Sequence, residues 1–393
     1  MFYLGIDIGK NTHVASLVDD KKKVIFKAFS FSNSIDGAES LIPKLEAFKN
    51  ELEVGMEATG HYWLSLYSYL VEKNFTVRVI NPIQTDGWRQ GIEIRKRKTD
   101  VIDSILIADL LRYGNFVETS LSNEDYLSLR NLSRFRSYLI SSIGDLKRKT
   151  IALLDQVFPE YASSFSNIFG KTSKEILSNF STHSDFEDIN SGDLNTFLES
   201  VTRKNYASKK IDELSKKASS SFGINFCLDS FSLQIKMLIE QISFIQNQVS
   251  DVENEIEVLL EKLNSPITTI PGIGSVNAAT ILGEIGDIKR FSTPSKLVAY
   301  AGLDASLDAS ISQSGEYEST YNHMSKRGSP YLRRALFQSA LRAEFCDPVF
   351  SAYYQKKITE GKHHLVATNA VARKLCHTIF AVLTKNEPYQ VQS

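Results

Sequence analysis

Two acidic residues follow a short basic run in the first third of the chain. The basic residues are Arg95, Lys96, Arg97 and Lys98. Thr99 comes next and can cap a helix, whose first turn would place Asp100 and Asp103 on one face. A solvated helix start also favours acids, because negative charge there interacts well with the helix dipole. The pair alone therefore does not separate a reactive site from an ordinary helix start.

Two further acids favour a reactive site. Asp7 closes the apolar run of residues 2–6, and Glu57 follows the run 52–56, so each is expected at or near a strand end. Strand ends and helix starts gather side chains into one cleft of an α/β fold. Four carboxylates meeting there would repel one another unless a divalent cation joined them, and oxygen ligands suit Mg²⁺ or Mn²⁺. Such a site beside Arg and Lys indicates phosphodiester chemistry.

The composition fits a globular protein of two or three domains. Of the 393 residues, 42% are hydrophobic and 23% are charged. A formal net charge of −1 gives no overall cationic signature, but residues 321–393 hold eleven Lys or Arg against four Asp or Glu. Three widely spaced cysteines predict buried thiols in a reducing cytoplasm. No apolar run is long enough to span a membrane, and the chain starts with a predicted strand, not a signal peptide.

The first 120 residues predict an α/β arrangement. Its order is three strands in an antiparallel meander, then helix, strand, helix, strand and helix. The strands are expected at residues 2–8, 13–18, 23–29, up to Glu57, and 76–80. The helices are expected at about 36–49, at 61–73 and from Thr99 onward. This order, with acids on the first strand, the fourth strand and the last helix, resembles the ribonuclease H-like fold of RuvC-type nucleases.

Long helical patterns follow. Apolar residues keep helical spacing over about 126–158, while 160–225 is rich in Ser and Asn and shows no chemistry. From Phe231 to Leu263 an unbroken heptad seam predicts a coiled coil. The seam either joins two copies of the chain or forms an intramolecular hairpin with the 126–158 helix.

The last third carries a glycine turn and a polar segment. Pro266 ends the heptad helix, and Gly272 and Gly274 lie in a turn that resembles a helix-hairpin-helix. Such a turn either offers N–H groups to a nucleic-acid phosphate or lets two helices pack closely. Residues 304–323 are polar and Ser-rich, and Ser329 is expected to cap the next helix. The cations around that helix start could hold a phosphate near a hydroxyl; they are Lys326, Arg327, Arg333 and Arg334.

Seven short motifs, in this order, resemble the DEDD transposases of the insertion-sequence family "one-ten". The motifs are Gly5-Ile6-Asp7, Glu57-Ala58-Thr59-Gly60, Lys98-Thr99-Asp100 with Asp103, Pro271-Gly272-Ile273-Gly274, Tyr300-Ala301-Gly302-Leu303, Gln313-Ser314-Gly315, and Ser325-Lys326-Arg327-Gly328 with Leu332-Arg333-Arg334. These transposases are similar to the bridge-RNA-guided recombinases.

The resemblance implies a transposase that cuts and rejoins DNA. Asp7, Glu57, Asp100 and Asp103 would hold Mg²⁺ or Mn²⁺, and Ser314 would be the nucleophile. A RuvC-like domain would span 1–125, a helical coiled-coil region 126–265 and a mainly helical transposase domain 266–393. The implied partners are DNA, a non-coding guide RNA and further copies in a dimer or tetramer, in the cytoplasm of a bacterium or archaeon and without a membrane.

Three alternatives compete with this interpretation. A RuvC-like structure-specific endonuclease would use the same acids to hydrolyse DNA and would need no serine. A non-enzymatic assembly protein would not need the intact acidic tetrad. The sugar-kinase and actin ATPase fold shares the strand order and begins with Asp-x-Gly, as Asp7-Ile8-Gly9 does, but no second such phosphate loop is evident.

Overall fold

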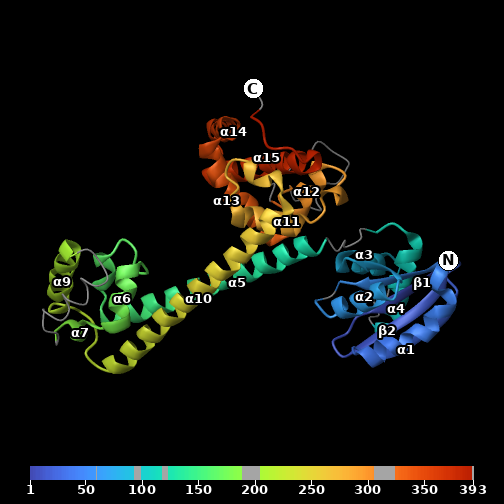
Figure 1. The fold of residues 1–393 in the computed structure, drawn as a ribbon, viewed down its shortest axis with the longest axis horizontal. Helices are drawn as coiled ribbons and strands as arrows, with labels where there is room; N and C mark the ends of the chain where they lie inside the picture. The colour runs from blue at the N-terminus through green and yellow to red at the C-terminus, as the bar shows by residue number, and fades with distance from the viewer. Residues whose placement is uncertain (59, 93–98, 117–122, 188–203, 305–323, 392–393) are drawn as a thin grey trace. The chain divides into compact units, whose positions relative to one another are not determined.

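The computed structural model describes residues 1–58, 60–92, 99–116, 123–187, 204–304 and 324–391. The chain divides into two compact units, Met1–Leu121 and Ser122–Ser393, and each is described by itself (Figure 1). Within the described ranges, no helix combines the length and the apolar character that crossing a membrane requires.

The first unit is built on a five-stranded mixed sheet in the order β3-β2-β1-β4-β5. The strands are β1 (Phe2–Asp7), β2 (Thr12–Asp19), β3 (Val24–Ser32), β4 (Leu52–Glu57) and β5 (Thr76–Ile80). The first three form the predicted antiparallel meander, and β4 and β5 run parallel to β1. The sequence prediction of these strands is confirmed to within a few residues.

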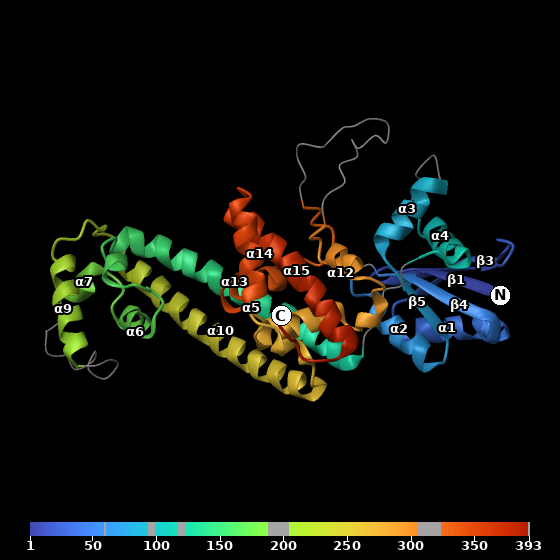
Figure 2. The same ribbon diagram turned by 90° about the horizontal axis from the view of Figure 1, so that it is seen from above.

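Helices cover both faces of this sheet, as Figure 2 shows: α1 and α2 on one side, α3 and α4 on the other. Their bounds are α1 (Ile35–Leu45), followed by the 3₁₀ turn η1 (Glu46–Glu51), α2 (Trp63–Glu72), α3 (Pro82–Ile92) and α4 (Asp100–Tyr113). Leu4 and Ile6 of β1 join the core formed with α1 and α2. Helix α3 was not predicted between the strand at 76–80 and the helix at Thr99, although proline is well tolerated in a first helical turn.

The second unit is organised around two long antiparallel helices, α5 (Glu124–Val157) and α10 (Leu228–Leu263) (Figure 1). Ile235 and Ile242 of the heptad seam, together with the neighbouring Ile239, are buried in a core that α5 shares. Arg136 of α5 pairs with Glu253 of α10 at 2.6 Å. Of the two arrangements that the heptad pattern allowed, the structure therefore shows the intramolecular hairpin.

A separate core lies at each end of the hairpin. One is completed by η2 (Tyr161–Ser164), α6 (Lys171–Asn179), α7 (His183–Glu187) and α9 (Lys204–Ala218). The other is completed by η3 (Pro266–Thr269), α11 (Ser275–Ile285), η4 (Ile288–Arg290), α12 (Pro294–Tyr300), α13 (Pro330–Cys346), α14 (Pro348–Thr359) and α15 (His364–Lys385). Leu129 of α5 and Ile256 of α10 belong to this second core, so the hairpin is a structural part of it.

The three cysteines are free thiols. Cys376 is buried, and burial raises the pKa of its thiol to about 12. Cys227 and Cys346 are exposed, which corrects the expectation that all three thiols are buried.

The seam residue Ile242 provides a stability test of the hairpin. Ile242→Ala is expected to lower the free energy of unfolding by about 2–4 kcal/mol, because it leaves a cavity in a packed core. The control is Leu233→Ala on the same helix, whose side chain is 56% exposed and whose loss should cost less than about 0.5 kcal/mol. Urea unfolding followed by circular dichroism measures both; equal costs would contradict the intramolecular packing.

A buried carboxylate fixes the end of α4 to the β2–β3 turn. Asp109 accepts hydrogen bonds from Lys22 at 2.9 Å and from Arg112 at 2.9 Å. Burial alone would raise the pKa of the Asp109 carboxyl, but the hydrogen bonds and charges of Lys22 and Arg112 outweigh it, so the pKa lies below its ordinary value. A depressed pKa stabilises the fold above the ordinary pKa of Asp, and this stabilisation is lost as the pH falls through the folded-state value.

Asp109→Asn is therefore expected to destabilise the first unit by about 1–3 kcal/mol at pH 7. The lower part of this range is expected, because Lys22 is half exposed and solvent weakens its interaction with Asp109. The difference from the wild type should shrink as the pH falls below 3.8, the ordinary value. Urea unfolding at several pH values measures this. The control is Glu39→Gln, at an exposed acid on α1, whose effect on stability should not change with pH. If the destabilisation by Asp109→Asn is the same at every pH, the ionised carboxylate does not contribute to stability.

Candidate active site and candidate nucleic-acid interface

Asp7 and Glu57 lie at the carboxyl ends of neighbouring parallel strands. Ile6 of β1 and Met56 of β4 are partners in the parallel register, and the two acids are the next residues along the strands. Adjacent parallel strands are about 4.8 Å apart, so these carboxylates start from neighbouring positions at one edge of the sheet. This placement follows the sequence prediction that each acid closes a strand.

The glycines two positions earlier show which face the acids share. A Cβ on Gly5 would lie 2.0 Å from the Ser104 carbonyl oxygen, and a Cβ on Gly55 would lie 2.4 Å from a side-chain atom of Leu111. Both glycines therefore allow α4 to lie directly on β1 and β4. Because side chains alternate along a strand, Asp7 and Glu57 belong to this same face, the one that α4 covers.

The other two acids lie in the first turn of α4. Thr99 is the N-cap, and its hydroxyl accepts a hydrogen bond from the Ile102 N–H at 3.3 Å, which confirms the predicted cap. Asp103 is buried, whereas Asp100 is exposed. The predicted pair thus consists of one carboxylate directed into the protein and one at the surface.

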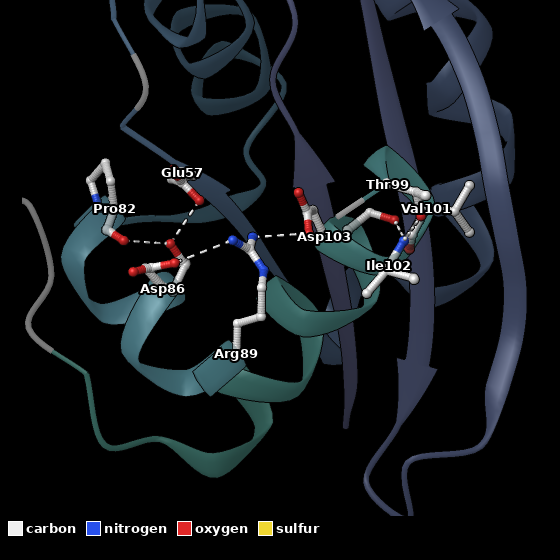
Figure 3. Close-up of polar contacts among 10 residues, drawn as sticks. Glu57, Pro82, Asp86, Arg89, Thr99, Val101, Ile102 and Asp103 are labelled. Carbon is white, nitrogen blue, oxygen red and sulfur yellow. Dashed lines mark hydrogen bonds and ion pairs between the residues drawn. The ribbon is translucent and has the colours of Figure 1, made fainter. Parts of the chain in front are cut away.

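Helix α3 contacts two of the four acids, as Figure 3 shows. The Thr85 hydroxyl lies 2.7 Å from Oε2 of Glu57, and the guanidinium of Arg89 donates to Oδ1 of Asp103 at 2.9 Å. Thr85 and Arg89 are four residues apart and so lie on one face of the helix. Neither residue was predicted from the sequence, because α3 was not predicted. The one local pattern that could have suggested a shared role is their spacing of four residues, which is typical of one helix face.

These residues match a divalent cation in type but do not form a finished cage. Carboxylate oxygens suit Mg²⁺ or Mn²⁺. Yet among the described residues no three His, Cys, Asp or Glu side chains are grouped so that they could hold a metal ion. Asp103 is instead neutralised by Arg89. A cation that used Asp103 would have to compete with this guanidinium.

Several predicted site residues lie outside the described residues. They are Arg95, Lys96, Arg97, Lys98 and Ser314. The chain on either side of the Ser314 segment is tied together: the Ser325 N–H donates to the Asp304 carbonyl at 2.9 Å, and the Ser329 N–H donates to the Tyr300 carbonyl at 2.9 Å. Residues 300–304 and 325–329 thus form a hydrogen-bonded base for the segment.

The predicted cations near this base differ in what they contact. Arg333 donates to the carbonyl oxygens of Ala301 at 3.1 Å and Lys326 at 3.3 Å, so its guanidinium holds the two sides of the base together. Lys326, Arg327 and Arg334 are exposed. The structure thus gives Arg333 a structural contact and leaves the other three cations at the surface.

The two glycines of the Pro-Gly-Ile-Gly turn also differ. Gly272 has a φ of +89°, and a Cβ there would lie 2.5 Å from the Ser339 carbonyl oxygen, so it permits close packing on α13. Gly274 has open space around its Cβ position and begins α11 without a side-chain cap. Gly272 therefore fits the alternative in which the turn lets two helices pack closely. At Gly274 the N–H groups at the start of α11 lie near the surface.

A buried carboxylate that the sequence analysis missed joins three helices of the second unit. Glu284 of α11 accepts from Arg134 of α5 at 2.6 and 3.0 Å, and from the hydroxyl of Ser329 at 2.8 Å. The same hydroxyl accepts the Leu332 N–H, which confirms Ser329 as the N-cap of α13. Burial would lower the pKa of Arg134, but Glu284 more than compensates and raises it. This network fixes the helix start that follows the Ser-rich segment.

Two family models match this chain. A family model for transposases of the DEDD type of IS110 matches residues 4–159, and a model described as "Transposase IS116/IS110/IS902 family" matches residues 264–355. A pilin gene-inverting protein of Moraxella bovis is 24% identical over 98% of this chain and 97% of its own length. A protein of insertion element IS116 from Streptomyces clavuligerus is 24% identical over 97% and 94%.

A protein of insertion element IS110 from Streptomyces coelicolor is 30% identical over 41% of this chain and 39% of its own length. The two family models match in the order expected for one transposase, the first over the unit that carries the four acids. Because the two family models together match parts of both units of the chain, the protein belongs to the IS110 family of transposases, enzymes that act on DNA.

Proposed function

We propose that this transposase cuts and rejoins DNA strands with a ribonuclease H-like domain, in which Asp7, Glu57, Asp100 and Asp103 are the metal ligands. The observation that carries the proposal is the placement of Asp7 and Glu57 at neighbouring strand ends on the face covered by α4. Asp103 at the start of that helix supports it. The sheet order β3-β2-β1-β4-β5, with β1, β4 and β5 parallel, agrees with a ribonuclease H-like fold.

A bound Mg²⁺ or Mn²⁺ would supply Lewis acidity to a scissile phosphate. The residues of this chain have separate tasks. The four acids would hold the cation, and the Thr85 hydroxyl contacts the Glu57 carboxylate and would orient it. Arg89 neutralises Asp103 while no cation is bound. Arg95, Lys96, Arg97 and Lys98, just ahead of α4, would contact the phosphates of the strand.

The proposed nucleophile is Ser314, in the polar segment whose base is described above. Its oxygen would attack the phosphorus and form a phosphoserine bond as the bond to the sugar oxygen breaks. The serine proton is released and the leaving oxygen takes up a proton. The phosphodiester energy is kept in the protein–DNA bond and remains available for rejoining. Lys326 and Arg327, exposed beside the base, would hold the phosphate.

Rejoining is favoured over simple hydrolysis by one of the relatives. A protein named for inverting a pilin gene aligns with nearly the whole of this chain. Inverting a DNA segment requires every cut end to be rejoined, which a hydrolytic RuvC-like endonuclease does not do. The second candidate function, structure-specific hydrolysis, therefore serves as the alternative outcome of the tests below.

We also propose a non-coding guide RNA and a homo-oligomer, dimer or tetramer, as partners. RNA pairing with DNA would supply sequence choice, while this protein reads backbone and shape. Self-association would use the outer face of α10, since its heptad seam is buried within the chain. That face exposes Met237, Phe244 and Val258, which are spaced by multiples of seven.

The acidic site is tested by Asp7→Asn, Glu57→Gln, Asp100→Asn and Asp103→Asn. Each is expected to abolish DNA cleavage in the presence of Mg²⁺. Asp7→Asn, Glu57→Gln and Asp100→Asn should leave the melting temperature of the metal-free protein unchanged or raised, since they remove negative charge from neighbouring acids. Asp103→Asn should lower it, because that change breaks the ion pair with Arg89. Strand-cleavage assays and thermal melts in EDTA measure these effects. Full activity in two of the four variants would rule out the metal site.

Arg89 gives a test that does not depend on activity. Arg89→Gln removes the cation that competes for Asp103, so Mn²⁺ should bind about tenfold more tightly, a change of about 1.4 kcal/mol. Calorimetric titration of the protein with Mn²⁺ measures this. Arg78→Gln on β5 is the matched control and should leave the affinity unchanged. Unchanged affinity in Arg89→Gln would show that Asp103 takes no part in metal binding.

The serine is tested by trapping on nicked DNA, denaturing electrophoresis and peptide mapping. Ser314→Ala should bind DNA normally yet form no covalent adduct. Ser312→Ala and Ser319→Ala should keep activity, because a hydroxyl displaced by even about 1 Å loses in-line geometry and about 100-fold in rate. An adduct at another serine would reassign the nucleophile. Cleavage without any adduct would establish the hydrolytic alternative.

A further inference from the structure

A polar cleft of about 440 Å³ opens in the second unit where α5, α11 and α13 meet. Its described lining contains two arginines, Arg136 and Arg334, and no acidic residue. Most of the other polar lining groups are hydroxyls and amides. The cleft therefore presents positive charge and hydrogen-bond donors, the combination that an anion requires.

The start of α11 forms one wall. Ser275, Val276 and Asn277, the first three residues of the helix, line the cleft. The N–H groups of a first helical turn have no intrahelical acceptor, and here Gly274 supplies no side-chain cap. These N–H groups and the positive end of the helix dipole favour a negative group at this position.

A buried serine on α5 provides independent evidence for a ligand. Ser133 lines the cleft, its side chain is only 5% exposed, and its hydroxyl has no hydrogen-bond partner among the described residues. A helical serine commonly bonds the carbonyl one turn earlier, which would satisfy it. Leaving a buried hydroxyl unpaired costs free energy. An acceptor that enters the cleft would remove that cost.

The two arginines differ in their availability. Arg136 is held by Glu253 at 2.6 Å, and because a guanidinium has five N–H donors, this contact positions the group without using all of them. Arg334 is exposed, and within the described residues it forms no ion pair. The cleft thus has one fixed and one adjustable cation.

We propose that this cleft binds a phosphodiester group of a nucleic-acid backbone, an inference that rests on the proposed function. The phosphate would accept from the N–H groups at the start of α11 and from the Ser133 hydroxyl, with Arg334 closing over it. A phosphodiester is favoured over a free anion because the exposed Arg334 and the volume of the cleft leave room for the chain to continue on both sides.

Gly274→Asp is the decisive variant. Its Cβ has open space and its φ of −85° suits any residue. An aspartate would cap α11 and occupy the N–H groups with its own charge, so the melting temperature should stay equal or rise. Binding of fluorescein-labelled duplex DNA and of a labelled RNA stem–loop is then measured by anisotropy. Affinity should fall about tenfold for the nucleic acid that uses the cleft, and the slope of log affinity against log salt should decrease by about 1.

Two further variants and a control complete the test. The control is Arg342→Gln, an exposed cation on α13 outside the cleft lining, which should bind within about twofold of the wild type. Arg334→Gln should lose about tenfold. Ser133→Ala should lose about threefold to tenfold with an unchanged or higher melting temperature, whereas a purely structural serine would lower the melting temperature and leave binding unchanged.

The outcomes separate the two proposals. If the wild type binds nucleic acid and neither Gly274→Asp nor Arg334→Gln weakens that binding, the proposal for the cleft is wrong and the proposed function is unaffected. A wild-type protein that binds neither probe would overturn both. If inorganic phosphate raises the melting temperature of the wild type and not of Gly274→Asp while nucleic-acid binding is equal in both, the cleft is a small-anion site and the phosphodiester proposal fails.

Discussion

The second unit depends on one ion pair, between the buried carboxylate of Glu284 and the partly exposed guanidinium of Arg134. It forms where α5 and α11 meet backbone to backbone: a Cβ on Gly283 would lie 2.5 Å from the Arg130 nitrogen. That approach brings the Glu284 carboxylate within reach of α5, and the Ser329 hydroxyl then adds the start of α13. Losing Arg134 would leave the buried Glu284 carboxylate with only the Ser329 hydroxyl and the more distant Arg130, at 3.8 Å, as partners. The polar cleft and the base of the Ser-rich segment both lie around helix starts that this contact fixes.

In the first unit the constraint is steric. Glycines at two neighbouring strand positions let α4 lie on the sheet, and this places its acidic first turn over the strand ends. Carboxylates placed close together in this way repel one another unless positive charge lies nearby. In the structure Arg89 supplies part of it through Asp103, and α3 thereby becomes part of the site. Helix α3, which leads in sequence from the last strand toward the basic run, is thereby joined to the start of α4.

Patterns local in sequence predicted much of this. Alternating apolar residues located the strands, helical spacing located α5 and α10, and the caps Thr99 and Ser329 are as expected. Features set by tertiary contact were not predictable. Nothing in the sequence near Arg89 reveals that it reaches Asp103, and the burial of Glu284 depends on a helix far earlier in the chain. The heptads fixed the periodicity of α10 but not its partner, because a hairpin and a dimer bury the same stripe.

The distance in sequence between Arg134 and Glu284 also affects how the protein folds while it is being synthesised. The two residues are 150 positions apart in the chain, and Leu129 beside Arg134 belongs to the core completed by α11 to α15. At about 5–20 residues per second, a ribosome would need roughly 6–26 seconds to reach the end of α11 after it has finished α5. During that interval the apolar stripe of α5 lacks α10 and α11, whereas the first unit already has its whole sheet. The first unit can therefore fold while the rest of the chain is still being made, whereas the core that includes Leu129 must wait until α11 to α15 leave the ribosome.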